Sequence, residues 1–129
     1  MELSRVADAR SYPVPPGAKD NAAYHRVRLQ GLDKTSDPGF WIALATYLPG
    51  CKVDRVAGKN GAAVYLVTDG EIRFKGQGQD VLLGRYDSVL VAEDETIEVM
   101  NESTDPARML VIHTTTENAR KYQLSFGET

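Results

Sequence analysis

The chain has 129 residues, of which 42% are hydrophobic, 26% charged and 8% aromatic, and this is the composition of a single globular domain. Such a balance excludes a collagen, a coiled coil and a disordered tail. The net charge is −3, from 15 basic and 18 acidic residues, and Lys and Arg do not gather in any segment, so nucleic acid is not expected as a partner.

The first part of the chain predicts an arm followed by two strands. Prolines and a glycine recur within residues 1–22, and because proline fixes φ and lacks a backbone donor, we expect an extended arm there. Residues 23–30 are predicted to form a strand. Aromatic and apolar residues predict a stronger strand over 40–48, which Pro49-Gly50 ends.

The rest of the chain predicts short strands separated by turns. Runs rich in Val, Ile, Leu, Tyr and Phe predict strands at 64–68, 72–75, 80–83, 88–91, 97–100 and 109–114. The Asp69-Gly70 pair predicts a hairpin turn, because glycine accepts the positive φ that such turns require. Strands of this length and spacing favour an antiparallel sandwich or barrel over βαβ units. Only the tail predicts a helix, since Thr114 and Glu117 have the spacing of a capping box before 118–123.

The segment after the stronger strand resembles the first signature motif of the cupins. That motif opens and closes on glycine, and Gly50 and Gly70 match both ends with every gap in register. Between its glycines the family carries two His and a Glu that bind a metal ion. The same three positions hold Val56, Gly58 and Ala63 here, so the frame of the motif is present without its metal ligands.

A second, looser match to the family follows. In the preferred register, the family's Gly, Pro, Gly, His and Asn positions hold Tyr86, Ala92, Asp94, Ile97 and Asn101. A rival register begins at Gly84 and puts Glu95 in the His position, but it loses the match at Asn101 and shortens the segment between the two motifs.

The resemblance covers about residues 40–114 and implies an all-β fold. The expected architecture is an antiparallel double-stranded β-helix, the cupin jelly-roll barrel, over residues 23–116. The extended arm at 1–22 precedes the barrel, and a short helix is expected in the C-terminal tail at 117–129. The resemblance implies a homodimer, and the extended arm could pair with the sheet edge of a neighbouring subunit.

The resemblance also implies that the four ligand positions face the barrel interior. The residues at these positions, Val56, Gly58, Ala63 and Ile97, offer only hydrocarbon or hydrogen, whereas a metal site needs imidazole and carboxylate donors. We therefore expect neither a metal nor another cofactor. Small side chains there leave space for an apolar cavity that takes a small organic molecule. The alternative is a barrel filled to core density.

Three residues are candidates for acid–base catalysis. Tyr65 shares a face with Ala63 by strand alternation, and its phenol could donate a hydrogen bond or transfer a proton. His113 ends the last predicted strand, and an imidazole titrates near neutral pH. Glu95 lies in a cluster of carboxylates at the turn that borders the cavity mouth in cupins. Each also has a structural explanation, as a core tyrosine, a packed histidine and a solvated acidic turn.

Three further residues are expected to line the cavity. Trp41 could form an aromatic wall for a ligand, or belong to the core or a dimer contact. Arg55 could anchor a polar end of the ligand or pair on a strand surface. His25 belongs to the early strand, and the pattern does not say which way it faces.

These features lead to one leading hypothesis and two alternatives. The hypothesis is a cupin that binds a small molecule and that, if it is an enzyme, is a metal-independent isomerase, dehydratase or lyase. The alternatives are a noncatalytic ligand sensor or accessory protein, and a structural dimer with a filled barrel. Cys51 is the single cysteine, and no apolar run has the length of a signal peptide or a membrane span. A cytoplasmic protein without a membrane partner is therefore expected.

Overall fold

The protein is built almost entirely of strands. The computed structural model describes residues 1–9, 24–32, 34–56 and 61–116. In chain order the described elements are η1 (Val6–Asp8), β1 (Tyr24–Gln30), β2 (Phe40–Tyr47), β3 (Lys52–Val56), β4 (Ala63–Asp69), β5 (Ile72–Gly76), β6 (Gln79–Leu83), β7 (Ser88–Val91), β8 (Thr96–Met100) and β9 (Ala107–Thr114). The all-β fold expected from the sequence is confirmed.

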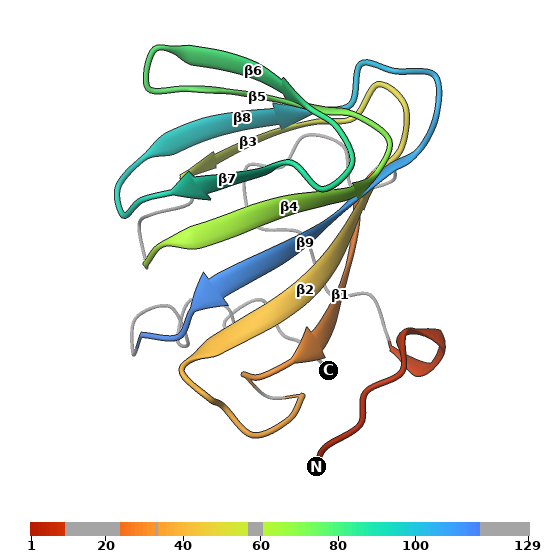
Figure 1. Cartoon of the computed structure of the whole chain (residues 1–129), viewed down its shortest axis with the longest axis vertical. Coiled ribbons are helices and arrows are strands. Elements are labelled where there is room, and N and C mark those ends of the chain that lie inside the picture. The colour runs from red at the N-terminus through yellow and green to blue at the C-terminus, as the bar shows by residue number, and fades with distance from the viewer. Residues whose placement is uncertain (10–23, 33, 57–60, 117–129) are drawn as a thin grey trace.

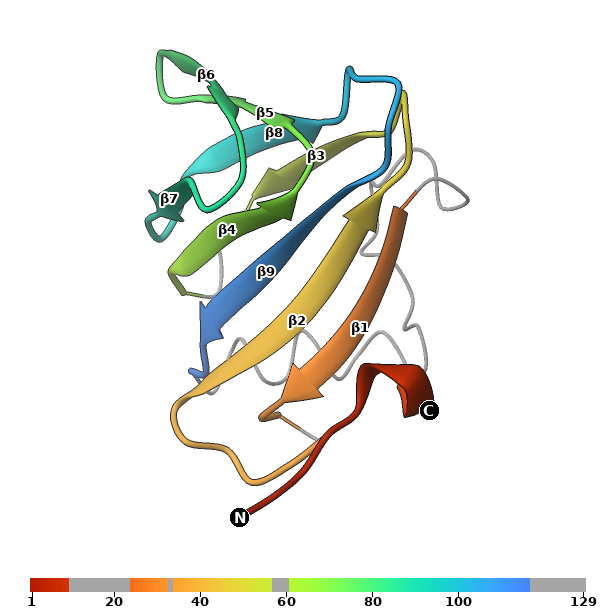
Figure 2. The same cartoon turned by 45° about the vertical axis from the view of Figure 1, so that its right-hand side comes forward.

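The strands form two antiparallel sheets. The larger sheet has the order β1-β2-β9-β4-β7, and the smaller one has the order β3-β8-β5-β6. In Figure 1 and Figure 2 the smaller sheet lies toward the β4 and β7 side of the larger sheet, and β1 lies at the far side. Order and pairing are those of a sandwich that closes into a barrel, as the jelly-roll prediction requires.

The core lies between the sheets and is built by alternate residues. On β2 and β9 every second side chain is buried, the period of two that strand geometry imposes. The smaller sheet contributes apolar side chains from three strands, namely Val53, Ile72, Phe74 and Val99. The two sheets therefore share one interior, into which any inward-facing polar residue must project.

One strand was missed in the sequence and one turn was wrongly interpreted. The strand is β3, in which the charged Lys52 and Asp54 are exposed on either side of the buried Val53. The hairpin predicted at Asp69-Gly70 is wrong, because β4 pairs with β7 and β9, whereas β5 pairs with β6 and β8. The chain turns at Gly70, with φ 76°, but crosses there from one sheet to the other.

The start of the chain packs on its own barrel. The Glu2 carboxylate accepts a hydrogen bond from the Ser36 backbone N–H at 2.9 Å, which lowers the pKa of Glu2 below its usual value. The Gln30 amide donates to the Glu2 carbonyl oxygen at 3.3 Å. The rest of the predicted arm and the helix predicted at 118–123 lie outside the described residues. Within the described ranges, no helix is long and apolar enough to cross a membrane.

The backbone distinguishes the two registers of the second motif. Tyr86 and Asp94 have φ of 69° and 67°, in the left-handed region that favours glycine. These are the two glycine positions of the register that begins at Tyr86. In the same register Ile97 and Asn101 occupy the His and Asn positions, and both are buried. The structure therefore agrees with the preferred register.

We expect Tyr86→Gly to raise the free energy of unfolding by up to about 1 kcal/mol. The left-handed conformation costs an L-residue about 1–2 kcal/mol, and glycine removes this cost while losing part of the gain to backbone entropy. The Tyr86 side chain is exposed, so little packing is lost. Urea denaturation measures the change, with Arg85→Gly as a control that should destabilise. A Tyr86→Gly variant as unstable as the control would contradict the prediction.

Candidate functional site

Four cross-strand neighbours form a row on the inner face of the larger sheet. Trp41 on β2, His113 on β9, Ala63 on β4 and Val91 on β7 are register partners in adjacent strands. All four side chains are buried. Neighbouring strands lie about 4.8 Å apart, so the backbones of His113 and Val91 are separated by about 10 Å. We call these four residues the inner row.

Contacts on its own sheet hold the imidazole of His113 in place. Its ring stacks on the Trp41 indole with a centroid distance of 5.0 Å and an angle of 7° between the planes. Its Nδ1 lies 2.7 Å from the Thr114 carbonyl oxygen. Because a carbonyl oxygen only accepts, Nδ1 carries the hydrogen and donates it. Nε2 is then the nitrogen that gains and loses a proton.

Gly61 provides the space beside this ring. A Cβ at Gly61 would lie 3.3 Å from His113 Cε1 and 2.5 Å from Thr114 Oγ1, and its φ of 137° is itself unfavourable for other residues. A side chain at this position would therefore push against the histidine and against the residue that sets its tautomer.

We expect Gly61→Ala to destabilise the protein by about 1–3 kcal/mol and to move the His113 ring. Gly39→Ala is the matched control, since Gly39 also has a positive φ, 100°, but no atom lies within 4 Å of its Cβ position. Urea denaturation measures the stability difference, and the His113 Cε1–H chemical shift reports the ring position. Equal losses in the two variants with an unmoved resonance would show that the clash is absent.

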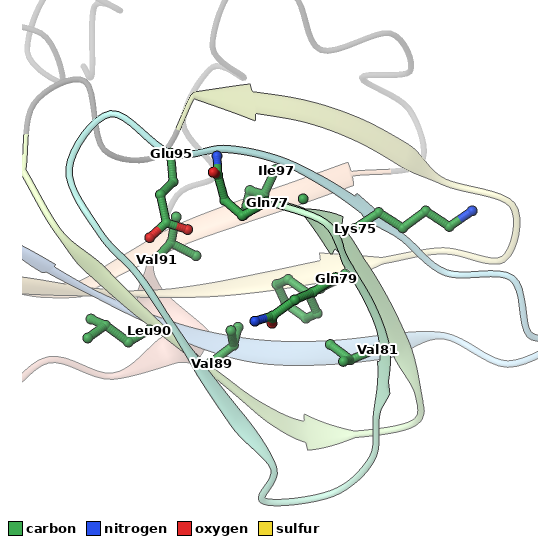
Figure 3. Close-up of a pocket in the computed structure, with 11 residues that line it drawn as sticks. Lys75, Gln77, Gln79, Val81, Val89, Leu90, Val91, Glu95 and Ile97 are labelled. Carbon is green, nitrogen blue, oxygen red and sulfur yellow. The ribbon is translucent and has the colours of Figure 1, made fainter.

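A cavity of about 190 Å³ opens beside the inner row, between the β5–β6 hairpin and β7. Its apolar lining consists of Phe74, Val81, Val89, Leu90, Val91 and Ile97. Figure 3 shows Gln77, Gln79 and Glu95 around this lining, while Lys75 extends away from it. Apolar walls with a few polar groups are the usual form of a small-molecule site.

The turn between β7 and β8 holds Glu95 at the cavity edge. The Glu95 backbone N–H donates to the Ala92 carbonyl at 3.2 Å, and its Oε1 accepts from the Ala92 N–H at 3.2 Å. Glu95 is half-buried, and in Figure 3 its carboxylate points toward Val91. The carboxylate is therefore oriented by its own turn and lies at the cavity.

Val91 belongs both to the cavity lining and to the inner row. Between it and His113 the row contains only Ala63, whose side chain is a single methyl group. The family's Glu position thus holds a methyl group, between the strand of the cavity wall and the strand of the imidazole. Glu95 lies at the cavity edge together with Val91, and His113 lies on the other side of Ala63 in the row.

The residues at the cupin metal positions do not fit a metal ion. Ala63 and Ile97 are buried in the interior and have no lone pair to donate. Gly58 and the side chains of Val56 and Arg55 lie outside the described residues. Among the residues that are described, no group of three His, Cys, Asp or Glu side chains could hold a metal ion.

The other predicted site residues divide between the two faces of the larger sheet. Tyr65 faces the interior and packs against Phe74, with the ring centroids 5.7 Å apart. The placement of His25 in the cavity is wrong, because His25 is exposed on the outer face of β1. The strand instead directs Arg26 and Arg28 inward, and both are buried.

Sequence reasoning missed the buried Arg28 and two exposed glutamines that line the cavity, Gln77 and Gln79. The two glutamines were hidden in the β5–β6 hairpin, whose turn lies at Gln77-Gly78 with positive φ at both residues. The signal for Arg28 was the pair of arginines spaced two residues apart in the first strand, Arg26 and Arg28. This signal could not be interpreted, because the sequence pattern does not show which side chains of β1 point into the barrel.

The chain is similar in sequence to a curated protein. It is 32% identical over 114 residues to "Beta-D-galactosidase Rv1717" of Mycobacterium tuberculosis, covering 86% of this chain and 91% of that protein. No family model matches the chain.

Solved structures share the fold at lower identity. A predicted oxalate decarboxylase from Thermotoga maritima has a TM-score of 0.75 at 14% identity and covers 89% of this chain and 100% of that one. A Cupin 2 conserved barrel domain protein from Salinispora arenicola has a TM-score of 0.68 at 15% identity, covering 97% and 98%. Fold, motif frame and sequence agree, and the chain is a small cupin that belongs to the family of the Mycobacterium tuberculosis β-D-galactosidase Rv1717.

Proposed function

We propose that this protein hydrolyses a β-galactoside in its barrel by acid–base chemistry of its own side chains. The observation that carries the proposal is the 32% identity, over 91% of its length, to a protein named a β-D-galactosidase. The proposal keeps the small-molecule cavity and the acid–base chemistry expected from the sequence. It selects hydrolysis in place of isomerisation, dehydration or lyase chemistry.

Hydrolysis of a glycoside needs one group that gives a proton and one that takes a proton. We assign the base to Glu95, whose carboxylate accepts a proton from water as the water oxygen bonds to the anomeric carbon. The bond from that carbon to the glycosidic oxygen breaks, and its electron pair goes to the oxygen. Protonated His113 gives its Nε2 proton to this oxygen, which leaves as the alcohol.

The hydrogen bond from Nδ1 of His113 to the Thr114 carbonyl supports this assignment. It remains in place when Nε2 loses its proton, so the ring returns to one defined tautomer. Tyr65 is proposed to donate its phenolic hydrogen to a sugar hydroxyl. No step passes through a metal, because Ala63 and Ile97 stand at the positions that would have to bind it.

The test is release of 4-nitrophenolate from 4-nitrophenyl β-D-galactopyranoside by protein purified from a host strain that lacks its own β-galactosidase. We expect turnover of the β-anomer and none of the α-anomer. Saturable galactose binding without turnover would favour the noncatalytic sensor instead. If the protein neither binds galactose nor turns over the substrate, the proposal is refuted.

A further inference from the structure

We propose that the sugar which this site prefers is a carboxylate-bearing one, a β-galacturonide, and that Arg28 and Trp41 recognise its carboxylate. The inference rests on the proposed function and names its substrate class. It starts from the inner face of β1, where Arg26 and Arg28 are 3% and 1% exposed. Burying a guanidinium is costly unless oxygen acceptors surround it.

The described interior contains buried basic side chains. Its buried ionisable side chains include two arginines and His113, and within the described ranges no Asp or Glu side chain is buried. Arg28 has contacts of its own. A guanidinium carries five N–H donors, however, so an arginine that already has a partner can still bind a carboxylate.

Arg28 reaches the inner row through Trp41. Its Cζ lies 5.7 Å from the centroid of the Trp41 ring, whose other neighbour in the sheet is the stacked His113. β1 and β9 flank β2 on opposite sides, so the indole lies between the guanidinium and the imidazole. A group bound by Arg28 therefore lies within one side chain of the proposed acid.

The indole itself has an unused donor. Trp41 is 2% exposed, and its Nε1–H has no acceptor among the described residues. Indole N–H groups only donate, so the missing partner must be a hydrogen-bond acceptor. A carboxylate would satisfy the Trp41 N–H and interact with the buried Arg28 guanidinium, because it offers several acceptor sites and a charge opposite to that of arginine. A galacturonide carries this carboxylate at the position where a galactoside carries a neutral hydroxymethyl group.

The experiment compares kcat/KM for 4-nitrophenyl β-D-galacturonide and 4-nitrophenyl β-D-galactopyranoside. We expect at least a tenfold preference for the galacturonide. Arg28→Met keeps the apolar stem in the core and removes the charge, and Trp41→Phe removes the indole N–H. Each should lower the ratio of kcat/KM for the galacturonide to kcat/KM for the galactoside by roughly 10- to 100-fold, the loss expected for a hydrogen bond to a charged group.

Preference for the neutral substrate, or a galacturonide preference that both variants retain, would overturn the inference and leave the proposed function standing. If neither substrate turns over, the proposed function fails. The inference about the carboxylate is then tested by sugar binding alone. In that case calorimetry should find D-galacturonate binding that exceeds D-galactose binding at least tenfold and is lost in Trp41→Phe. Equal binding of the two sugars would refute it.

Discussion

Replacing His113 by alanine should lower kcat for β-galactoside hydrolysis by about 10²- to 10⁴-fold, the range that a general acid supplies. The imidazole is buried, stacks on Trp41 and has its Nδ1–H committed to the Thr114 carbonyl, so Nε2 is the group available for proton transfer. Steady-state release of galactose from methyl β-D-galactopyranoside, whose alkoxide leaving group needs the proton, measures the loss, and urea denaturation checks that the variant is folded.

His25 provides the matched control, since it is the other of the two histidines in the chain and is exposed on the outer face of β1. His25→Ala should retain full kcat. If His113→Ala is folded and as active as His25→Ala, His113 is a packing residue and the acid must be sought elsewhere.

The second large effect concerns stability. Asn101 is 1% exposed, and its amide donates to the Tyr47 and Asp105 carbonyls at 2.9 and 2.8 Å. Its Oδ1 accepts from the Ser103 N–H and hydroxyl. Asn101→Ala leaves these groups without their partner, so we expect a loss of roughly 3–5 kcal/mol in the free energy of unfolding, as for a broken buried network. The urea midpoint measures it.

Thr104→Ala, an exposed change in the same loop, should stay within about 0.5 kcal/mol of the natural protein. Asn101→Asp keeps the acceptor for Ser103 but loses the donors to the two carbonyls, so it should also destabilise. A stable Asn101→Ala protein would mean that the loop between β8 and β9 does not depend on this side chain.

The fold was predictable where apolar residues and turn residues alternate strongly. The strand over 40–47 and those from residue 63 onward met this condition. In β3 the charged Lys52 and Asp54 alternate with valine, so composition alone concealed the strand. The turn at Gly70 was foreseen because positive φ is a local property. Its role as a crossing between sheets was not, because strand pairing is decided by contacts distant in sequence.

The site was predictable as far as the cupin frame reached. The frame placed Ala63 and Ile97 in the interior, and strand alternation placed Tyr65 there. It did not reach β1, where Val27 and Leu29 are the apolar positions and a hydrophobic pattern would bury them. The structure buries Arg26 and Arg28 instead. A strand that buries its arginines breaks the rule for a core, and such exceptions are expected at functional sites.

The proposed hydrolysis depends on acid–base chemistry of side chains, in a barrel whose residues at the cupin metal positions have no donor atoms in their side chains. The most direct test is to measure metal content and β-galactoside hydrolysis before and after dialysis against a strong chelator. We expect substoichiometric metal and an unchanged kcat. Loss of activity on chelation, with recovery on addition of one equivalent of a divalent cation, would contradict the account.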